Sequence, residues 1–247
     1  PPNPDTLEIH GHPGINTADA DFTRDNEHEL AVLPLHAGSE VIWAQTISRH
    51  VRKAVRKSER EGLRVSHETS LADIREFFYP LYVRSMFRLG SIPHPLSYFT
   101  ACFETYGDKM RFVWALKDDV RIACLLGFES GKRISITNIV SDERFWHLRP
   151  NDLIHWELIQ RACTNGLEYF DFGSVRYDGQ SQYKKKWGCE QQPRAYYFLK
   201  NAPQDNKTRT FNSSGKAMQL AGKLWATAVP AFAASRLGPI LRKHLMR

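Results

Sequence analysis

The feature of this chain that most constrains its fold is a run of three strand-like segments, followed by a buried helix and one more strand. The three segments cover residues 111–117, 121–130 and 133–140, with turns at Asp118-Asp119 and Gly131-Lys132 between them. Turns this short join antiparallel neighbours in a sheet. A helix over 151–164 and a strand over 167–172 then complete a strand–helix–strand crossover. The sequence therefore predicts an α/β (α+β) chain with a mixed, largely antiparallel sheet flanked by helices.

The same pattern extends along the chain in both directions. We expect further strands over 6–10, 30–35, 63–67 and 194–200, and further helices over 44–61, 71–89 and 98–106.

The helix over 151–164 has a clear start signal. Pro150 suits the first turn because its missing N–H needs no partner there, and Asn151 and Asp152 supply capping oxygens and negative charge. Such a helix start can hold an anion or orient a substrate, so we regard Arg149, Asn151 and Asp152 as candidate substrate-binding residues. Simple capping of the helix is the alternative.

Two polar residues lie late in strands that are otherwise apolar. Asp171 stands between Phe170 and Phe172, and because an unpaired buried charge is costly it must be exposed at the strand end or paired. Asp171 is thus a candidate general base, with a salt bridge or turn cap as the alternative. Asn138 is a candidate substrate-binding residue if it faces the cleft, and a solvent-facing position is equally open.

A lysine-rich segment follows a polar, glycine-containing loop. Tyr183, Trp187 and the three lysines between them come before the strand over 194–200. Side chains alternate between the faces of a strand, so three successive lysines cannot all point away from the aromatic rings. We expect at least one lysine to face the same pocket as Tyr183 and Trp187. A solvated charge run is the alternative.

Taken in order, these segments resemble the FemAB-like family of acyl and aminoacyl transferases, which have GNAT (acetyltransferase-type) folds. The motifs are Asn151-Asp152-Leu153-Ile154-His155-Trp156-Glu157-Leu158, Phe170-Asp171-Phe172-Gly173 and Tyr183-Lys184-Lys185-Lys186-Trp187-Gly188. Upstream, Arg88-Leu89-Gly90-Ser91-Ile92-Pro93, Tyr98-Phe99 and the basic segment 47–62 are also similar to the family's. The likeness covers residues 40–200.

The resemblance implies an enzyme that forms an amide bond between an activated acyl donor and an amine acceptor in cell-envelope or polysaccharide metabolism. It implies that Lys184 stabilises the oxyanion or the donor's phosphates, and that Tyr183, Lys186 and Trp187 belong to the substrate pocket. Asp171 is the candidate that takes the proton from the amine. A non-catalytic binding module at the membrane and an acetyl-CoA-dependent N-acetyltransferase are the alternatives.

Two departures from the family pattern bear on the donor. The family has phenylalanine at the position of Tyr183, so this chain has an additional hydroxyl there. The residues before the helix, 142–149, are bulky and contain no glycine, whereas loops that cradle a pyrophosphate use backbone amides helped by glycines. We expect no tightly bound cofactor, and the donor stays open between aminoacyl-tRNA and acyl-CoA.

A basic stripe marks the helix over 44–61. Three- and four-residue spacing places its members on one helical face: Arg49, Arg52, Lys53, Arg56 and Lys57, with Arg60 beyond them. Like charges at these spacings repel by about a few tenths of a kcal/mol per pair. The stripe therefore predicts an anionic partner such as a tRNA backbone, a nucleotide-linked sugar or an anionic lipid. A solvated face is the alternative.

The net charge of +7 is concentrated at the C-terminal end. Eight of the 34 Lys and Arg residues, and none of the 27 acids, lie from Asn206 onward, so the rest of the chain is near neutral. This segment also carries apolar patches around Trp225 and Leu241. The pattern predicts a basic amphipathic helical tail that binds an anionic membrane surface or packs on the protein's own sheet.

We expect three units: residues 1–66 as the end of a first GNAT-like half whose earlier part is missing, 67–205 as the transferase domain, and 206–247 as the tail. The four cysteines lack metal-ligand spacing, so no metal site is predicted. Without a visible signal peptide, we expect a cytoplasmic protein that is peripheral at the inner face of the membrane. The acceptor is expected to be a small-molecule, glycan or peptide amine, and the sequence indicates no oligomeric state.

Overall fold

The structure is a computed structural model that describes residues 8–11, 22–175 and 178–199, with side chains over 29–175 and 178–192. The strands are β1 (Glu8–Gly11), β2 (Phe22–Pro34), β3 (Arg64–Ser66), β4 (Met110–Lys117), β5 (Val120–Ser130), β6 (Arg133–Ser141), β7 (Tyr169–Val175) and β8 (Glu190–Leu199). The α-helices are α1 (Gly38–Val41), α2 (Arg49–Arg60), α3 (Leu71–Asp73), α4 (Tyr79–Arg88), α5 (Leu96–Tyr106), α6 (Pro150–Thr164) and α7 (Asp178–Lys185). Shorter π or 3₁₀ segments are η1 (Ile42–Thr46), η2 (Ile74–Phe78), η3 (Gly107–Lys109) and η4 (Glu143–Leu148).

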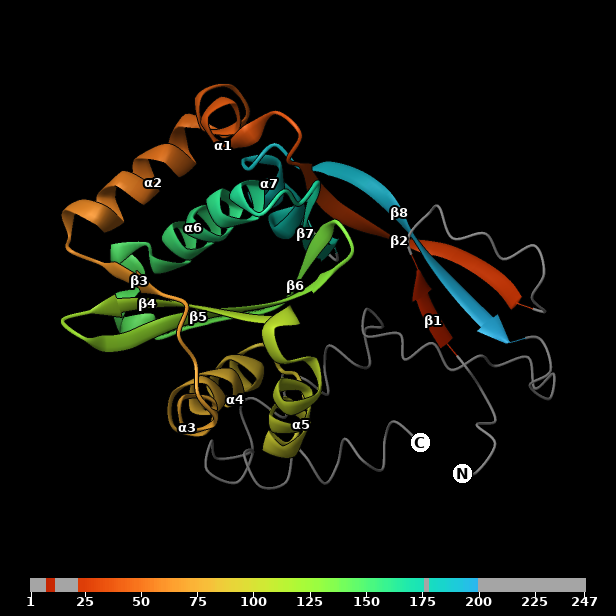
Figure 1. The fold of residues 1–247 in the computed structure, drawn as a ribbon, viewed down its shortest axis with the longest axis horizontal. Helices are drawn as coiled ribbons and strands as arrows, with labels where there is room; N and C mark the ends of the chain where they lie inside the picture. The colour runs from red at the N-terminus through yellow and green to blue at the C-terminus, as the bar shows by residue number, and fades with distance from the viewer. Residues whose placement is uncertain (1–7, 12–21, 176–177, 200–247) are drawn as a thin grey trace.

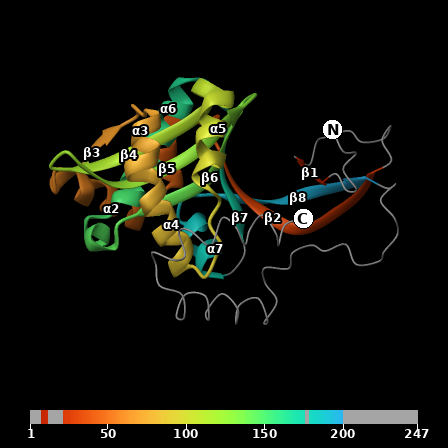
Figure 2. The same ribbon diagram turned by 90° about the horizontal axis from the view of Figure 1, so that it is seen from below.

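The eight strands form one sheet in the order β1-β8-β2-β7-β6-β5-β4-β3. All neighbours are antiparallel except β6 and β7, which the crossover through α6 makes parallel. The predicted fold class, a mixed and largely antiparallel sheet flanked by helices, is therefore confirmed. Figure 2 shows β1, β8 and the adjoining part of β2 extending away from the helices.

Helices cover both faces of the sheet, with α1, α2 and α6 on one side and α3, α4 and α5 on the other (Figure 1). Each side has its own hydrophobic core. The core under α2 and α6 includes Val55, Ile154 and Phe170, and the core under α4 and α5 includes Phe78 and Phe99. Among the described residues, no helix has the length and apolarity needed to cross a bilayer.

Residues 30–66 share this architecture with the residues that follow. Strand β2 pairs with β7 and β8, and Val51 and Val55 of α2 lie in the same core as Ile154 and Phe170. The boundary predicted at residue 66 therefore does not separate two hydrophobic cores. The tail predicted over 206–247 lies outside the described residues.

Two local predictions need correction. The polar, glycine-containing loop expected before Tyr183 contains the start of the helix α7, which turns Tyr183 and Lys184 toward the core, and Trp187 packs in the same core from the turn after this helix. The helix expected over 44–61 is two segments, because the chain is extended at Ile47 before α2 begins. The Ser48 side chain caps α2 by accepting a hydrogen bond from the Val51 N–H.

The parallel pair at the centre of the sheet is short. β6 and β7 are paired only from Arg133 with Tyr169 to Ser135 with Asp171. Beyond that point, β6 continues beside β5 as far as Ser141, while β7 continues beside β2 as far as Val175. The two strands therefore part at the end of the sheet from which α6 begins.

Candidate active site

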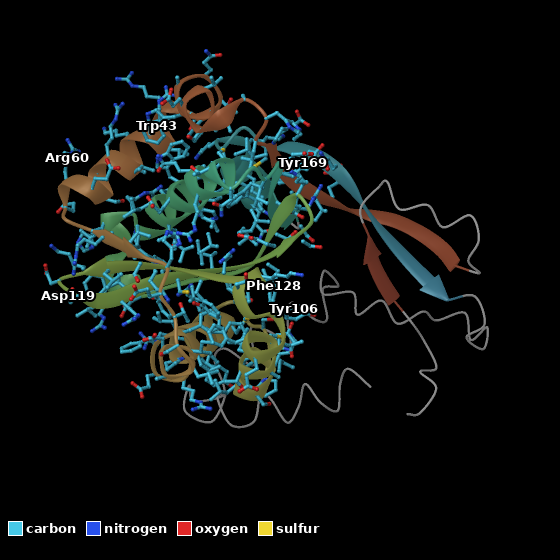
Figure 3. All side chains as sticks on the ribbon, in the orientation of Figure 1. Trp43, Arg60, Tyr106, Asp119, Phe128 and Tyr169 are labelled. Atoms are coloured by element: carbon cyan, nitrogen blue, oxygen red, sulfur yellow. The ribbon has the colours of Figure 1, made fainter. Side chains whose placement is uncertain are left out.

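A groove of about 380 Å³ lies between α2 and the start of α6, with α7 contributing to its wall. Its polar lining is mostly basic: Lys53, Lys57, Arg60, Arg149 and Lys186, together with His50. The remaining polar residues are Asp152 and Tyr183. In Figure 3, Arg60 marks the C-terminal end of α2, and Trp43 lies near the other end of that helix. The structure thus brings together Lys53, Lys57, Arg149, Asp152, Tyr183 and Lys186, all of which the sequence had singled out.

The groove exists because α2 packs directly on the segment that leads into α6. Val51, Ala54, Val55 and Ser58 form the buried side of α2. The hydroxyl of Ser58 lies 2.9 Å from the carbonyl oxygens of both Leu148 and Arg149, and Ser58 is fully buried. This contact fixes the basic side of α2 next to the first turn of α6.

A second groove of about 490 Å³ runs along α2, lined by Arg49, Arg52, Lys53, Arg56 and Arg60. Two of these cations have local partners. The Arg52 Nη1 donates to the carbonyl oxygens of Trp43, Ala44 and Ile47, at 2.9, 3.2 and 2.5 Å. The Arg56 guanidinium lies 5.8 Å from the centre of the Trp43 ring. Arg52 therefore caps the turn before α2, whereas the exposed Arg49 and Lys53 present their charge to solvent.

The start of α6 differs from an anion-binding helix start. Arg149 precedes the helix in the left-handed conformation (φ 63°, ψ 39°), and Pro150 has no N–H to offer. The Asp152 N–H already donates to the Arg149 carbonyl oxygen at 3.2 Å. Anion binding in this groove must therefore rely on cationic side chains more than on backbone amides.

Asp152 supplies the one carboxylate in the groove lining. Only 3% of the residue is exposed, and its Oδ2 lies 3.0 Å from the Arg149 Nη2. Its Oδ1 is buried and has no hydrogen-bond partner within the part of the chain that the structure describes. Burial raises the pKa of the Asp152 carboxyl, and the nearby Arg149 only partly offsets this effect.

Asn151 faces the end of β6 instead. Its Nδ2 donates to the Ser141 hydroxyl at 3.4 Å, and its carbonyl oxygen lies 2.8 Å from the His155 Nδ1.

Asn138 lies on the other face of the sheet. Its neighbours Ile139 and Val140 pack in the cores under α6 and under α4–α5, respectively, so alternation along β6 places Asn138 on the α4–α5 side. The structure therefore does not bring Asn138 into the groove.

Asp171 is held by three partners at the last paired position of β6 and β7. Its carboxylate accepts from the Arg133 Nη1 at 3.2 Å, the Ser135 hydroxyl at 3.4 Å and the Gly173 N–H at 2.7 Å. Because Phe170 and Phe172 point into the core under α6, Asp171 points to the other face. These contacts favour the salt-bridge alternative, and a general-base role for Asp171 stays a prediction.

Lys184 lies on the buried side of α7, with 8% of the residue exposed. Its Nζ donates to the carbonyl oxygens of Gly173 and Ser174 at 2.9 and 2.8 Å. The ammonium thus ties α7 to the end of β7, where the strand has left β6. A role for Lys184 at the oxyanion stays a prediction, and the contacts show that the side chain also holds the fold together.

His155 is a buried histidine behind the groove, and the sequence reasoning did not single it out. It is 3% exposed and stacks on Phe172, with ring centres 5.0 Å apart and planes at 15°, and it packs beside Tyr183 and Trp187. Burial lowers the pKa of His155 to about 4, and burial also raises the pKa of Tyr183. Its burial could have been predicted, because His155 lies on the apolar side of the helix that begins at Pro150.

The described residues contain no group of three or more His, Cys, Asp or Glu that could hold a metal ion. What they do contain is a cationic groove beside two parallel strands that part, which is a place where open sheets bind ligands.

A family model described as the acetyltransferase (GNAT) domain matches residues 46–185. This match covers more than half of the chain, so the chain belongs to the acetyltransferase (GNAT) domain family. No curated protein matches the chain.

Solved structures with the same fold include FemX, with a TM-score of 0.61 and 14% identity over 77% of this chain and 65% of that chain. L-PGS from Bacillus licheniformis has a TM-score of 0.55 and 16% identity, covering 85% of this chain and 68% of its own. The C-terminal domain (DUF2156) of a candidate lysylphosphatidylglycerol synthetase from Agrobacterium fabrum has a TM-score of 0.54 and 14% identity, over 83% and 65%. The FemAB-like resemblance is confirmed at the level of the fold. The chain spans just under two thirds of the length of the FemX chain.

The pH dependence of stability tests the burial of His155. Its folded-state pKa of about 4 lies below the unfolded value of 6.5, so the unfolded state binds more protons between these values. The stabilisation is complete above pH 6.5 and is lost as the pH falls toward 4, a change of about 3 kcal/mol in the free energy of unfolding. We expect denaturant titrations to show this loss in the wild type and a flatter profile in His155→Gln. The same change at the exposed His147 serves as the control, and equal profiles for all three proteins would contradict the assignment.

Replacement of Lys184 separates its two roles. Lys184→Met removes the ammonium that donates to the carbonyl oxygens of Gly173 and Ser174, and we expect the free energy of unfolding to fall by about 1–3 kcal/mol. Lys185→Met, at an exposed position on the same helix, should change it by less than about 0.5 kcal/mol. An unchanged melting temperature for Lys184→Met would show that these contacts contribute little and would favour a purely catalytic role.

Proposed function

We propose that this chain is a GNAT-fold acyltransferase of the FemAB-like type, which transfers an acyl or aminoacyl group from an anionic donor to an amine acceptor. The observation that carries the proposal is the cationic groove between α2 and α6, beside the point where β6 and β7 part. A phosphate-bearing donor fits such a lining, because five lysine or arginine side chains face one groove. The acyl group would then reach toward the parted strands.

The donor chemistry follows from the start of α6. Pro150 has no N–H, and the N–H of Asp152 already donates to the Arg149 carbonyl oxygen, so few backbone amides remain to bind a pyrophosphate. The segment before the helix is η4, whose residues are bulky. These features disfavour the backbone cradle that acetyl-CoA would use and favour a donor held by Lys and Arg side chains. An aminoacyl-tRNA has an anionic phosphate backbone, and the arginine- and lysine-lined groove along α2 offers that backbone a further cationic path.

The chemistry needs positioning and proton transfer. Amide formation requires a neutral amine and a carbonyl whose developing negative charge is stabilised. The groove can place the donor, and the half-buried Tyr183, which packs with the buried Phe172 and Trp187 behind it, can exclude water from the acyl end. Asp171 and Lys184 remain candidates for the proton transfer and for the oxyanion, respectively.

The setting is part of the proposal. One structure with this fold carries a name that refers to lysylphosphatidylglycerol synthesis, which supports a role in cell-envelope metabolism. We propose a small-molecule, glycan or peptide amine as the acceptor, and a cytoplasmic enzyme that acts at the membrane surface. The assignment of residues 1–66 to a first GNAT-like half and of 206–247 to a membrane-binding tail belongs to the same proposal.

Salt-dependent binding tests the groove. Lys53→Gln/Lys57→Gln removes two cations from its lining, and we expect the affinity for aminoacyl-tRNA to fall at least about tenfold at low salt, with the slope of log Kd against log salt shallower by about 1.5. Lys109→Gln/Lys132→Gln changes the net charge equally at exposed positions outside the groove and should leave both values near wild type. Equal losses in the two double variants would contradict a specific groove. Thermal stabilisation by acetyl-CoA, with none by either charged or uncharged tRNA, would assign the chain to acetyl transfer instead.

A further inference from the structure

A tryptophan at the open end of the sheet is exposed, and it lies outside both grooves. Trp146 belongs to η4 and is 44% exposed, whereas Trp114, Trp156 and Trp187 are buried. Single exposed apolar residues are common on protein surfaces, so exposure alone assigns no role to the ring. Trp146 differs from such a residue because its neighbours fix the orientation of its ring.

Two contacts hold the Trp146 ring. Its Nε1 donates a hydrogen bond to the hydroxyl of Ser141 at 2.8 Å, and Ser141 is itself 4% exposed. The Arg88 guanidinium, from the last turn of α4, lies 4.7 Å from the centre of the ring and covers one of its faces. The exposed surface therefore belongs largely to the other face. A ligand that stacks there meets a ring that is already ordered, which lowers the entropic cost of binding.

The charged side chains around the ring are paired with one another. Arg88 forms an ion pair with Glu143. The Asp142 Oδ2 lies 2.7 Å from the Arg144 Nη2 and 3.7 Å from the Arg84 Nη1. Three arginines and two carboxylates thus offset most of each other's charge, whereas in the groove five lysine or arginine side chains face one carboxylate. Such surroundings favour a ligand with hydrogen-bonding groups and no net charge over a phosphate.

The Trp146 ring and the groove lie on opposite sides of the same end of the sheet. Strand β6 ends at Ser141, the residue that the indole bonds, beyond the point where β6 and β7 have parted. Arg88 belongs to α4, which covers the face of the sheet opposite α2 and α6 (Figure 1). Arg149, a residue of the groove, donates its N–H to the Trp146 carbonyl oxygen at 3.0 Å. A molecule on the ring and a donor in the groove therefore approach the parted strands from opposite sides.

We infer that Trp146 is the stacking platform for a neutral sugar ring of the acceptor, and that the acceptor amine is carried by a glycan. The C–H groups on one face of a pyranose carry partial positive charge and match the negative face of an indole ring. The hydroxyl groups of a sugar both donate and accept, so they fit Glu143 and Arg144, whose side chains are 48% and 78% exposed. This inference rests on the proposed function, because it assigns the acceptor of that reaction.

Tryptophan side-chain NMR tests the inference. The probes are β-linked trisaccharides of glucose, galactose and N-acetylglucosamine, which carry no phosphate and no ammonium. The indole N–H signal that is absent from Trp146→Phe identifies Trp146 in the wild type. We expect at least one trisaccharide to shift this signal in a saturable way, while the other indole signals stay in place.

Two variants at the same position separate stacking from general apolar contact. Trp146→Phe keeps a flat aromatic ring, and we expect the affinity measured by saturation-transfer NMR to fall by no more than about threefold. Trp146→Leu keeps an apolar side chain without a flat ring and should lower the affinity at least about tenfold. Tyr98→Leu makes a similar change at an equally exposed aromatic residue of α5 and should keep the wild-type affinity. Melting temperatures check that each variant is folded.

The outcomes separate the inference from the proposed function. A Trp146 signal that responds to none of the trisaccharides would overturn the inference, and so would equal affinities for Trp146→Leu and the wild type. A response to the trinucleotide CCA and to no sugar would show that the ring stacks on a nucleobase, which would also overturn it. None of these results bears on tRNA binding by Lys53 and Lys57, whose failure would overturn the groove and leave a sugar site at Trp146 standing.

Discussion

The contact between α2 and the residues that lead into α6 determines the rest of the site. Ser58, ninety residues before Leu148 in the chain, lies within hydrogen-bond distance of the Leu148 and Arg149 carbonyl oxygens in a fully buried position. Without this packing, the cations of α2 would form a solvated helix face. With it, they form one wall of a groove whose other wall contains Arg149, Asp152 and Tyr183.

The groove and the sheet are linked through the separation of β6 and β7. Asp171 holds the last paired position by bonding Arg133, Ser135 and the Gly173 N–H, and Lys184 holds β7 after it has turned toward β2. The two candidate catalytic residues, Asp171 from its place in the sequence and Lys184 from the family resemblance, therefore also support the open end of the sheet. Because both side chains are buried and accept or donate several hydrogen bonds, replacing either is expected to lower the stability of the fold as well as any catalytic contribution.

The fold could be predicted from the sequence because its signals are local, whereas the site depends on contacts between distant segments. Short turns and apolar runs specify β4, β5 and β6, and Pro150 marks the start of α6. Helix α7 was missed because it is short, polar and contains Gly179, although the four-residue spacing of Tyr183 and Trp187 was a helical signal. The pairing of Asp171 with Arg133, 38 residues away, leaves no local pattern. The burial of Asp152 likewise depends on a helix one hundred residues upstream.

Hydrogen–deuterium exchange, with and without charged tRNA, tests most directly whether the groove between α2 and α6 is where the donor binds. The account predicts slower amide exchange over 49–60 and 149–153 when charged tRNA is bound, with no change in α5 on the opposite face of the sheet. Protection confined to α4 and α5, or tRNA binding with no protection in α2, would contradict it.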